Sequence, residues 1–130
     1  MKKQTENWLN SASDDLALIG EIVNNEQLTH MAAFHAQQAI EKSLKSILEE
    51  KEAKVPKIHD IITLKGKIDQ YIKLIYNQDI FDQINELYID SKYPTDLGLL
   101  PDGKPSVQTS KLFFDTASKI FADIKTFLSQ

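Results

Sequence analysis

The sequence contains no arginine, and all fifteen residues counted as Lys or Arg are lysine. A guanidinium group binds a carboxylate or a phosphate through two parallel hydrogen bonds, and a lysine ammonium does not reproduce this contact. Mechanisms that require such a contact are therefore excluded unless a partner supplies the arginine. Cysteine is also absent, which excludes disulfide bonds, thiolate metal ligands and a thiol nucleophile, and which fits a reducing cytosol.

Several function classes lack the features that they need. The four glycines are scattered at positions 20, 66, 98 and 103, so there is no glycine-rich phosphate loop. No apolar run approaches the roughly 18 residues of a membrane helix. The formal net charge of -4 and the sequence pI of about 5.3 argue against a surface that holds nucleic acid nonspecifically. We expect a soluble, cytoplasmic protein without a membrane span.

The apolar residues recur with helical spacing along almost the whole chain. A length of 130 residues suits one domain, residues 1–130, with its own core. The expected fold is all-α, an antiparallel up-and-down bundle of four to five helices. The predicted helices span residues 5–24, 29–53, 60–76, 79–92 and 106–128, and residues 94–105 form a loop with three of the four prolines.

Polar residues mark several predicted helix ends. Thr29 is the expected N-cap of the second helix and Ser106 that of the last, while Asp60 is expected as a cap or first-turn acid of the third. The second helix is expected to end before Val55-Pro56, because proline disfavours helical geometry in the preceding residue. The Asp14-Asp15 pair is interpreted as acids near a helix start, where carboxylates favour the macrodipole.

The second predicted helix combines an apolar arc with a narrow polar stripe. The arc, which must face the core, contains Ala33, Ile40, Leu44, Ile47 and Leu48. The stripe lies beside Phe34 and contains His35, Gln38, Lys42 and Lys45. Glu41 stands one turn before Lys45, which predicts an i,i+4 ion pair. Small residues occupy the remaining positions and would let another helix approach closely: Ala32, Ala36, Ala39, Ser43 and Ser46.

Two interpretations of the stripe stay open. Charged residues on a helix usually form a solvated face. Alternatively the stripe is a surface for a ligand or partner, with lysines for phosphate and with glutamine and histidine for hydrogen bonds. His59 likewise either caps or braces the third helix or meets the stripe at the mouth of a groove near Lys92 and Tyr93, where a nucleotide would be held by charge and stacking.

Three separated segments, in order, resemble the HEPN family. They are FHAQQAIEKSLKSIL at residues 34–48, KIHDIITL at 57–64 and LYIDSKYPTD at 87–96. The resemblance covers nearly the whole chain and implies a small helical bundle whose second helix carries an aromatic residue, a Gln-Ala-x-Glu-Lys run and a further lysine. A His-Asp pair, here His59 and Asp60, opens the next helix. Lys92, Tyr93 and Pro94 stand where family members often have Arg-Tyr-Pro, so lysine takes the place of the arginine.

The resemblance implies one of two roles. Some HEPN proteins are ribonucleases whose dimers join an arginine with a histidine that follows within a few residues. Others lack this motif and accompany a minimal nucleotidyltransferase encoded beside them, or are thought to bind nucleotides. This chain has no arginine for the strict motif, and the nearest substitute, Lys54 followed by His59, falls in a predicted connection between helices.

We therefore expect a non-enzymatic HEPN protein, the homodimeric partner of a minimal nucleotidyltransferase in a toxin–antitoxin-like system. It would bind a nucleotide or the partner in a helical groove, without a cofactor or a metal site. The alternatives are a ribonuclease toxin with a degenerate, arginine-free site and a structural dimerisation module without a small ligand. The expected binding residues are His35, Gln38, Glu41, Lys42, Lys45, His59, Asp60, Lys92 and Tyr93.

Overall fold

The chain forms a helical bundle in the computed structural model, which describes residues 1–87, 99–100 and 103–130. Five helices and no strand are present in these residues. They are α1 (Lys3–Ile22), α2 (Thr29–Lys51), α3 (Ile61–Ile68), α4 (Gln78–Asn85) and α5 (Val107–Leu128). The expected all-α bundle is confirmed.

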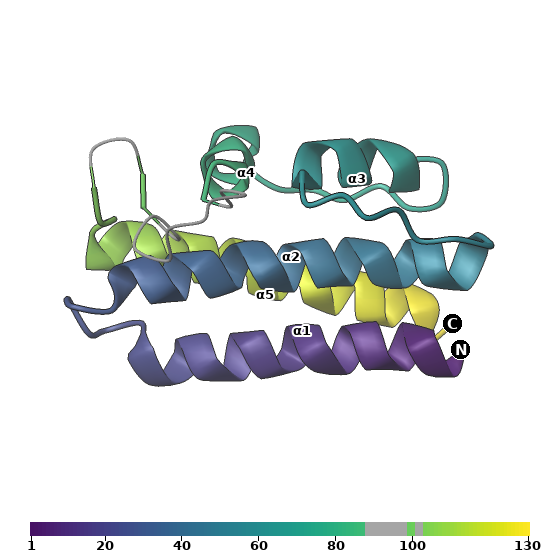
Figure 1. Cartoon of the computed structure of the whole chain (residues 1–130), viewed down its shortest axis with the longest axis horizontal. Coiled ribbons are helices and arrows are strands. Elements are labelled where there is room, and N and C mark those ends of the chain that lie inside the picture. The colour runs from purple at the N-terminus through teal and green to yellow at the C-terminus, as the bar shows by residue number, and fades with distance from the viewer. Residues whose placement is uncertain (88–98, 101–102) are drawn as a thin grey trace.

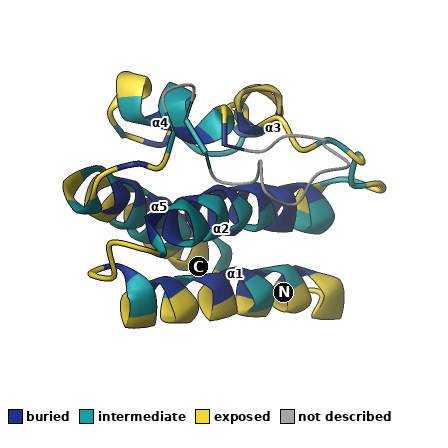
Figure 2. Cartoon of the chain, turned by 60° about the vertical axis from the view of Figure 1, so that its left-hand side comes forward, coloured by how far each residue is buried: buried dark blue, intermediate teal, exposed yellow. Residues whose placement is uncertain are grey.

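The helix α2 lies at the centre of the bundle. It contacts each of the other four helices, whereas α1 contacts only α2 and α5. Figure 1 shows α1 along one side of α2 and the short helices α3 and α4 on the opposite side. Buried positions therefore run along α2, while the outer side of α1 is exposed (Figure 2). None of these five helices is long and apolar enough to cross a membrane.

The core forms from the apolar stripes of the three long helices. All five residues of the arc predicted on α2 are fully buried. Buried residues recur at helical spacing on α5 and on α1: Phe113, Ala117, Ile120 and Ile124, and Leu9, Ala12 and Ile19. Periodicity predicted this core correctly because a long amphipathic helix has only one side to bury.

The small residues of α2 are already enclosed by the chain itself. Ala32, Ala36, Ala39, Ser43 and Ser46 are all buried. Ser43 and Ser46 turn their hydroxyl groups back to the carbonyls of Ala39 and Ser43, at 2.7 and 2.6 Å. The neighbouring helices of the same chain make the expected close approach and cover this side of α2, so it is not open to the expected homodimer. A homodimer through another surface stays a prediction.

The third helix is shorter than the predicted span of residues 60–76. Asp60 is its N-cap, and its Oδ1 accepts hydrogen bonds from the backbone N–H groups of Ile62 and Thr63 at 2.9 and 3.1 Å. The helix ends at Ile68, and residues 72–77 are not helical. There Ile72, Leu74 and Tyr76 pack on the core while Ile75 is 72% exposed. Such alternation suits an extended, β-branched and aromatic segment better than a helix.

The fourth helix also ends earlier than residue 92. Its N-cap is Asn77, whose Oδ1 accepts from the Ile80 N–H at 3.0 Å. After Asn85 the chain tightens into i→i+3 bonds, with the Leu87 N–H donating to the Ile84 carbonyl at 3.0 Å. Such bonds commonly close the last turn of a helix. The rest of the predicted span lies outside the described residues.

Of the two remaining predicted N-caps, one is confirmed and the other is wrong. Ser106 caps α5 as expected, and its Oγ accepts from the Thr109 N–H at 3.0 Å. Thr29 is instead the first residue of α2, and the N-cap position falls on Leu28, whose side chain makes no capping bond. The Thr29 prediction failed because residues 25–28 already form turns, with the Leu28 N–H bonded to the Asn25 carbonyl at 3.0 Å.

Shortening a leucine on the central helix tests this packing. Leu44→Ala removes a fully buried side chain of α2, whereas Leu112→Ala changes a side chain of α5 that is 50% exposed. We expect Leu44→Ala to lower the free energy of unfolding by about 3 kcal/mol, because it leaves a cavity. Leu112→Ala, the matched control, should change it by less than about 1 kcal/mol. Urea denaturation measures both, and equal losses would contradict the burial of α2.

Candidate functional site

The polar side chains of α2 form two hydrogen-bonded groups on adjacent rows of the helix, one with Asp15 of α1 and one with His59 of the segment before α3. We call the two groups together the α2 polar cluster. Its members are Asp15, His35, Gln37, Gln38, Glu41, Lys42, Lys45 and His59. Two carboxylates, Asp15 and Glu41, are the acceptors on which the cluster depends.

Asp15 joins α1 to α2. Its Oδ1 lies 2.9 Å from His35 Nδ1, and its Oδ2 accepts from Lys42 Nζ at 2.7 Å. Asp15 is buried in the middle of α1, so its interpretation as a helix-start acid is wrong. A buried carboxylate requires positively charged or hydrogen-bonding partners, and the stripe of α2 supplies them.

Glu41 joins α2 to the segment before α3. Its Oε2 accepts from Lys45 Nζ at 2.9 Å and lies 3.1 Å from His59 Nδ1. Its Oε1 accepts from Gln37 Nε2 at 3.2 Å. The predicted i,i+4 ion pair is therefore confirmed, and both of its side chains are only 6% exposed. Enclosure makes such a pair interact more strongly than it would in water.

Gln37 was not predicted as a site residue. It joins Glu41 to the backbone of His59. Its Nε2 also donates to the carbonyl of His59 at 3.1 Å, and its Oε1 accepts from Gln38 Nε2 at 2.7 Å. Gln37 is fully buried. One feature of the sequence points to it: Gln37, Glu41 and Lys45 follow one another at i,i+4 and form a second polar row, which shares Lys45 with the predicted stripe.

Trp8 of α1 covers the end of this second row. Lys45 Nζ lies 5.6 Å from the centre of the Trp8 ring, within the range of a cation–π contact. The indole Nε1 donates to Glu49 Oε1 at 3.1 Å. Lys45 is thus held between an aromatic face and the Glu41 carboxylate, and it is 5% exposed. The stripe is consequently not a solvated face along its whole length.

The structure brings together six of the nine predicted binding residues. His35, Gln38 and Lys42 are half-buried along α2, Glu41 and Lys45 are buried, and the His59 side chain is 46% exposed. Asp60 stands apart as the cap of α3. Lys92 and Tyr93, with the groove mouth expected near them, lie outside the described residues. His59 contacts Glu41, which lies beside the stripe, and its expected place at the mouth of a groove stays a prediction.

The chemistry of the cluster is dominated by charges that satisfy one another. Two carboxylates face two ammonium groups, so the cluster has no net charge when its histidines are neutral. His35 and His59 are each held by a carboxylate, an arrangement that orients an imidazole and fixes its tautomer. Within the described ranges, no three His, Asp or Glu side chains converge as a metal site requires.

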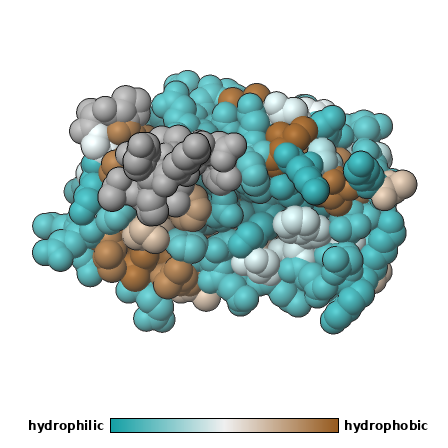
Figure 3. Space-filling view, in the orientation of Figure 1, coloured by the Kyte–Doolittle hydropathy of each residue, from teal (hydrophilic) through white to brown (hydrophobic). Residues whose placement is uncertain are grey.

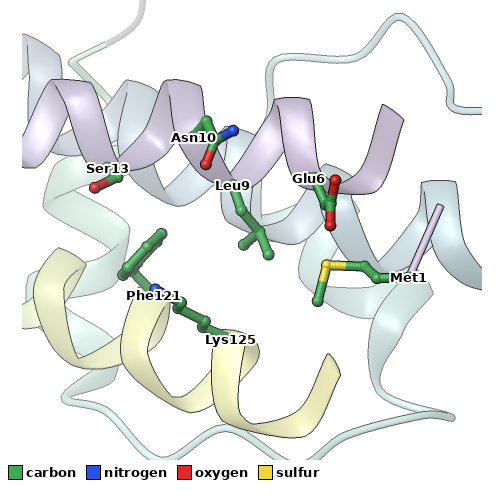
Figure 4. Close-up of a pocket in the computed structure, with 7 residues that line it drawn as sticks. All are labelled: Met1, Glu6, Leu9, Asn10, Ser13, Phe121 and Lys125. Carbon is green, nitrogen blue, oxygen red and sulfur yellow. The ribbon is translucent and has the colours of Figure 1, made fainter. Parts of the chain in front are cut away.

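Hollows outside the cluster were not predicted from the sequence. One of about 370 Å³ lies between α1 and α5 (Figure 4). Leu9 and Phe121 supply apolar side chains there, and Glu6 and Lys125 supply charges. A second, of about 490 Å³, lies at the N-terminal ends of α2 and α5. A third, of about 520 Å³, lies beyond the C-terminal end of α2 and includes Lys54, Lys57 and Lys67.

The family comparison agrees with the bundle and with the motifs. The model of the HEPN domain matches residues 5–126. The chain therefore belongs to the HEPN family, and the resemblance carried by the second helix, the His-Asp pair and the segment near Lys92 is confirmed. No curated protein matches the chain.

Two solved structures share the fold. One is TT1696 from Thermus thermophilus, with a TM-score of 0.74 and 22% sequence identity over 97% of this chain and 99% of that chain. The other is ST0689, described as an archaeal HEPN homologue, with a TM-score of 0.66 and 22% identity over 97% and 98%. At this identity the likeness supports the arrangement of helices and not a shared activity.

The buried pair of Glu41 and Lys45 can be tested by neutralising one member and then both. Glu41→Gln leaves the Lys45 ammonium enclosed without its carboxylate, so we expect a loss of about 3 kcal/mol of unfolding free energy. Adding Lys45→Met removes the stranded charge, and the double variant should recover much of that loss. Thermal and urea unfolding measure both.

Asp123→Asn is the matched control for this cycle. Asp123 accepts from Lys119 at 2.8 Å with the same i,i+4 spacing, but the two side chains are 42% and 57% exposed. An exposed pair contributes about 0.5 kcal/mol, so this variant should change stability little. A Glu41→Gln loss no larger than that of Asp123→Asn would show that enclosure does not strengthen the pair.

Proposed function

We propose that this HEPN protein acts by binding rather than by catalysis. Its expected role is that of the partner of a minimal nucleotidyltransferase in a two-component, toxin–antitoxin-like system. The exposed edge of the α2 polar cluster, which includes His35, Gln38 and His59, would meet the partner or a nucleotide. The observation that carries the proposal is that the lysines of the cluster are already paired in a chain without arginine.

The missing arginine supports the non-catalytic role. A scissile phosphate needs donors that hold it in place while the charge of the transition state develops. The lysines of the cluster that accompany the two histidines are Lys42 and Lys45, and each is bonded to the carboxylate that holds a histidine. A substrate phosphate would have to displace a carboxylate from each of them.

The same ion pairs favour the partner protein over a nucleotide as the occupant of this edge. Lys42 Nζ lies 2.7 Å from Asp15 and Lys45 Nζ lies 2.9 Å from Glu41. A phosphate arriving here would also meet these two carboxylates and be repelled by them. A protein surface can instead use the hydrogen-bonding groups of Gln38 and of the histidine side chains, without breaking a lysine–carboxylate pair.

The character of the surface suits a partner that is bound reversibly. The face seen in Figure 3 is mainly hydrophilic, and its hydrophobic residues form separate small groups. Non-obligate protein interfaces are about as apolar as the rest of a protein surface. An extended hydrophobic face is thus not needed for the proposed complex.

Co-purification tests the partner role. The chain, expressed with the minimal nucleotidyltransferase encoded beside its gene, should retain that protein through affinity and size-exclusion chromatography. Gln38→Ala shortens a half-buried side chain at the edge of the cluster and should reduce the retained fraction several-fold. Gln70→Ala, an exposed glutamine beyond the end of α3, is the matched control and should retain it fully. A locus without such a neighbour, or equal retention by both variants, contradicts the proposal.

An RNA assay tests the absence of catalysis. The purified chain should leave structured and unstructured RNAs intact over hours, because the two lysines of the α2 polar cluster are engaged by carboxylates and do not hold a scissile phosphate beside His35 or His59. Product formation is followed on denaturing gels, with a preparation of His59→Ala alongside. Cleavage by the parent chain that His59→Ala loses would establish the ribonuclease alternative. Cleavage by both preparations in equal amounts would indicate a contaminating nuclease.

A further inference from the structure

The N-terminal ends of two long helices meet at one end of the bundle. The helices α2 and α5 both begin at the left-hand end in Figure 1. Their first turns are in contact there, because Ser110 Oγ donates to the carbonyl of Thr29 at 3.2 Å. The hollow of about 490 Å³ lies between them and is lined from both helices, with Thr29 on one side and Ser106, Val107 and Gln108 on the other.

Both helix starts hold backbone donors that the helices themselves do not use. The first N–H groups of an α-helix have no acceptor within it. Ser106 Oγ satisfies the N–H of Thr109, which leaves the N–H groups of Val107 and Gln108. The N-cap residue of α2, Leu28, makes no side-chain capping bond, and neither helix has an acidic residue in its first turn. Two positive dipole ends therefore face the same hollow.

A buried hydroxyl without a partner is a second and independent indication of a ligand. Thr29 lines the hollow and is 1% exposed, and its Oγ1 has no hydrogen-bond partner among the residues that the structure describes. Leaving a buried polar group unpaired costs about 1–3 kcal/mol. Threonine in a helix populates two χ1 rotamers, so rotation can turn this hydroxyl to an incoming acceptor.

Some charged side chains at this end of the bundle favour a bound anion and others oppose it. Lys104 reaches the turn before α2 and donates from Nζ to the carbonyl of Gln27 at 3.0 Å. Burial, and then the positive charge of Lys104, lower the pKa of His30. His30 Nδ1 is buried and likewise has no hydrogen-bond partner in the described part of the chain. Glu26 lines the hollow and opposes an anion.

We propose that this hollow binds a phosphate group through the paired starts of α2 and α5. The bound phosphate would accept hydrogen bonds from the N–H groups of Val107 and Gln108 and from the Thr29 hydroxyl, with Lys104 adding charge. A tetrahedral oxyanion presents oxygens in several directions and so matches donors that come from two helices. Anions bind readily at a single helix N-terminus, and here two add their fields. The site is separate from the α2 polar cluster and does not depend on the proposed partner.

The direct test is a titration of the isolated chain with inorganic phosphate, followed by amide chemical shifts. Chloride at matched ionic strength is the reference. The largest shifts should fall on Thr29, His30, Val107 and Gln108, and they should saturate. The same amides should respond to a nucleoside monophosphate, with tighter binding if the natural source is a nucleotide and equal binding if it is free phosphate. The proposal is overturned if the amide shifts are spread over residues near lysines elsewhere in the chain, or if chloride produces the same shifts.

Three substitutions separate this site from general charge attraction. Thr29→Val keeps the side-chain volume but removes the hydroxyl, and it should weaken phosphate binding about tenfold, the equivalent of one hydrogen bond to a charged group. Lys104→Gln should weaken it about threefold at low salt. Glu26→Gln removes the opposing carboxylate and should strengthen it by a similar factor.

Lys57→Gln is the matched control, because it removes one lysine charge near the C-terminal end of α2, beside the third hollow. It should leave the affinity unchanged. Equal weakening by Lys57→Gln and Lys104→Gln would show that net charge alone attracts phosphate and would overturn the site. If Thr29→Val binds phosphate as the parent does, the hydroxyl is not a ligand and the paired-start geometry is wrong. Neither result bears on retention of the nucleotidyltransferase.

Discussion

Enclosure of α2 imposes the main constraint on this bundle. Four helices contact α2, so a charge on most of its faces must find its counter-charge within the chain. Glu41 and Lys45 satisfy each other on α2, and Asp15 of α1 meets Lys42 and His35. The two carboxylates also hold neighbouring segments against α2: Asp15 holds α1, and Glu41, through His59, holds the segment before α3. The residues most suggestive of a ligand site are thus also structural.

The parts of the fold that depend on long periodic patterns followed from the sequence. The arc of α2 was predicted correctly because this helix is long and its apolar residues lie on one side, and the helical spacing of apolar residues holds in the same way for the buried stripe of α5. The third helix was overextended because Ile72 and Ile75 continue the spacing of Ile61, Leu64 and Ile68. A helical repeat and an alternating repeat share many positions over such a short stretch, and only tertiary packing separates them. Extended backbone places Ile72 and Leu74 against the core and leaves Ile75 outside.

The candidate site was predictable where its members share a helix and not where they come from different ones. The i,i+4 pair of Glu41 and Lys45 follows from spacing alone. The pairing of Asp15 with Lys42 joins residues 27 apart, and their meeting depends on how α1 packs against α2. Even so, Asp15 occupies the same stripe as Leu9, Ala12 and Ile19. A lone carboxylate within an apolar stripe indicates a buried charge whose partner lies on another element.

The place of Trp8 has a spectroscopic consequence. It is the only tryptophan of the chain, and it lies where α1 covers the end of the buried polar row, with its indole bonded to Glu49 and its ring beside Lys45. Intrinsic tryptophan emission therefore comes from a single position at the seam between α1 and α2. Separation of these two helices would hydrate the indole and shift its emission to longer wavelength, even while the circular dichroism of both helices persisted.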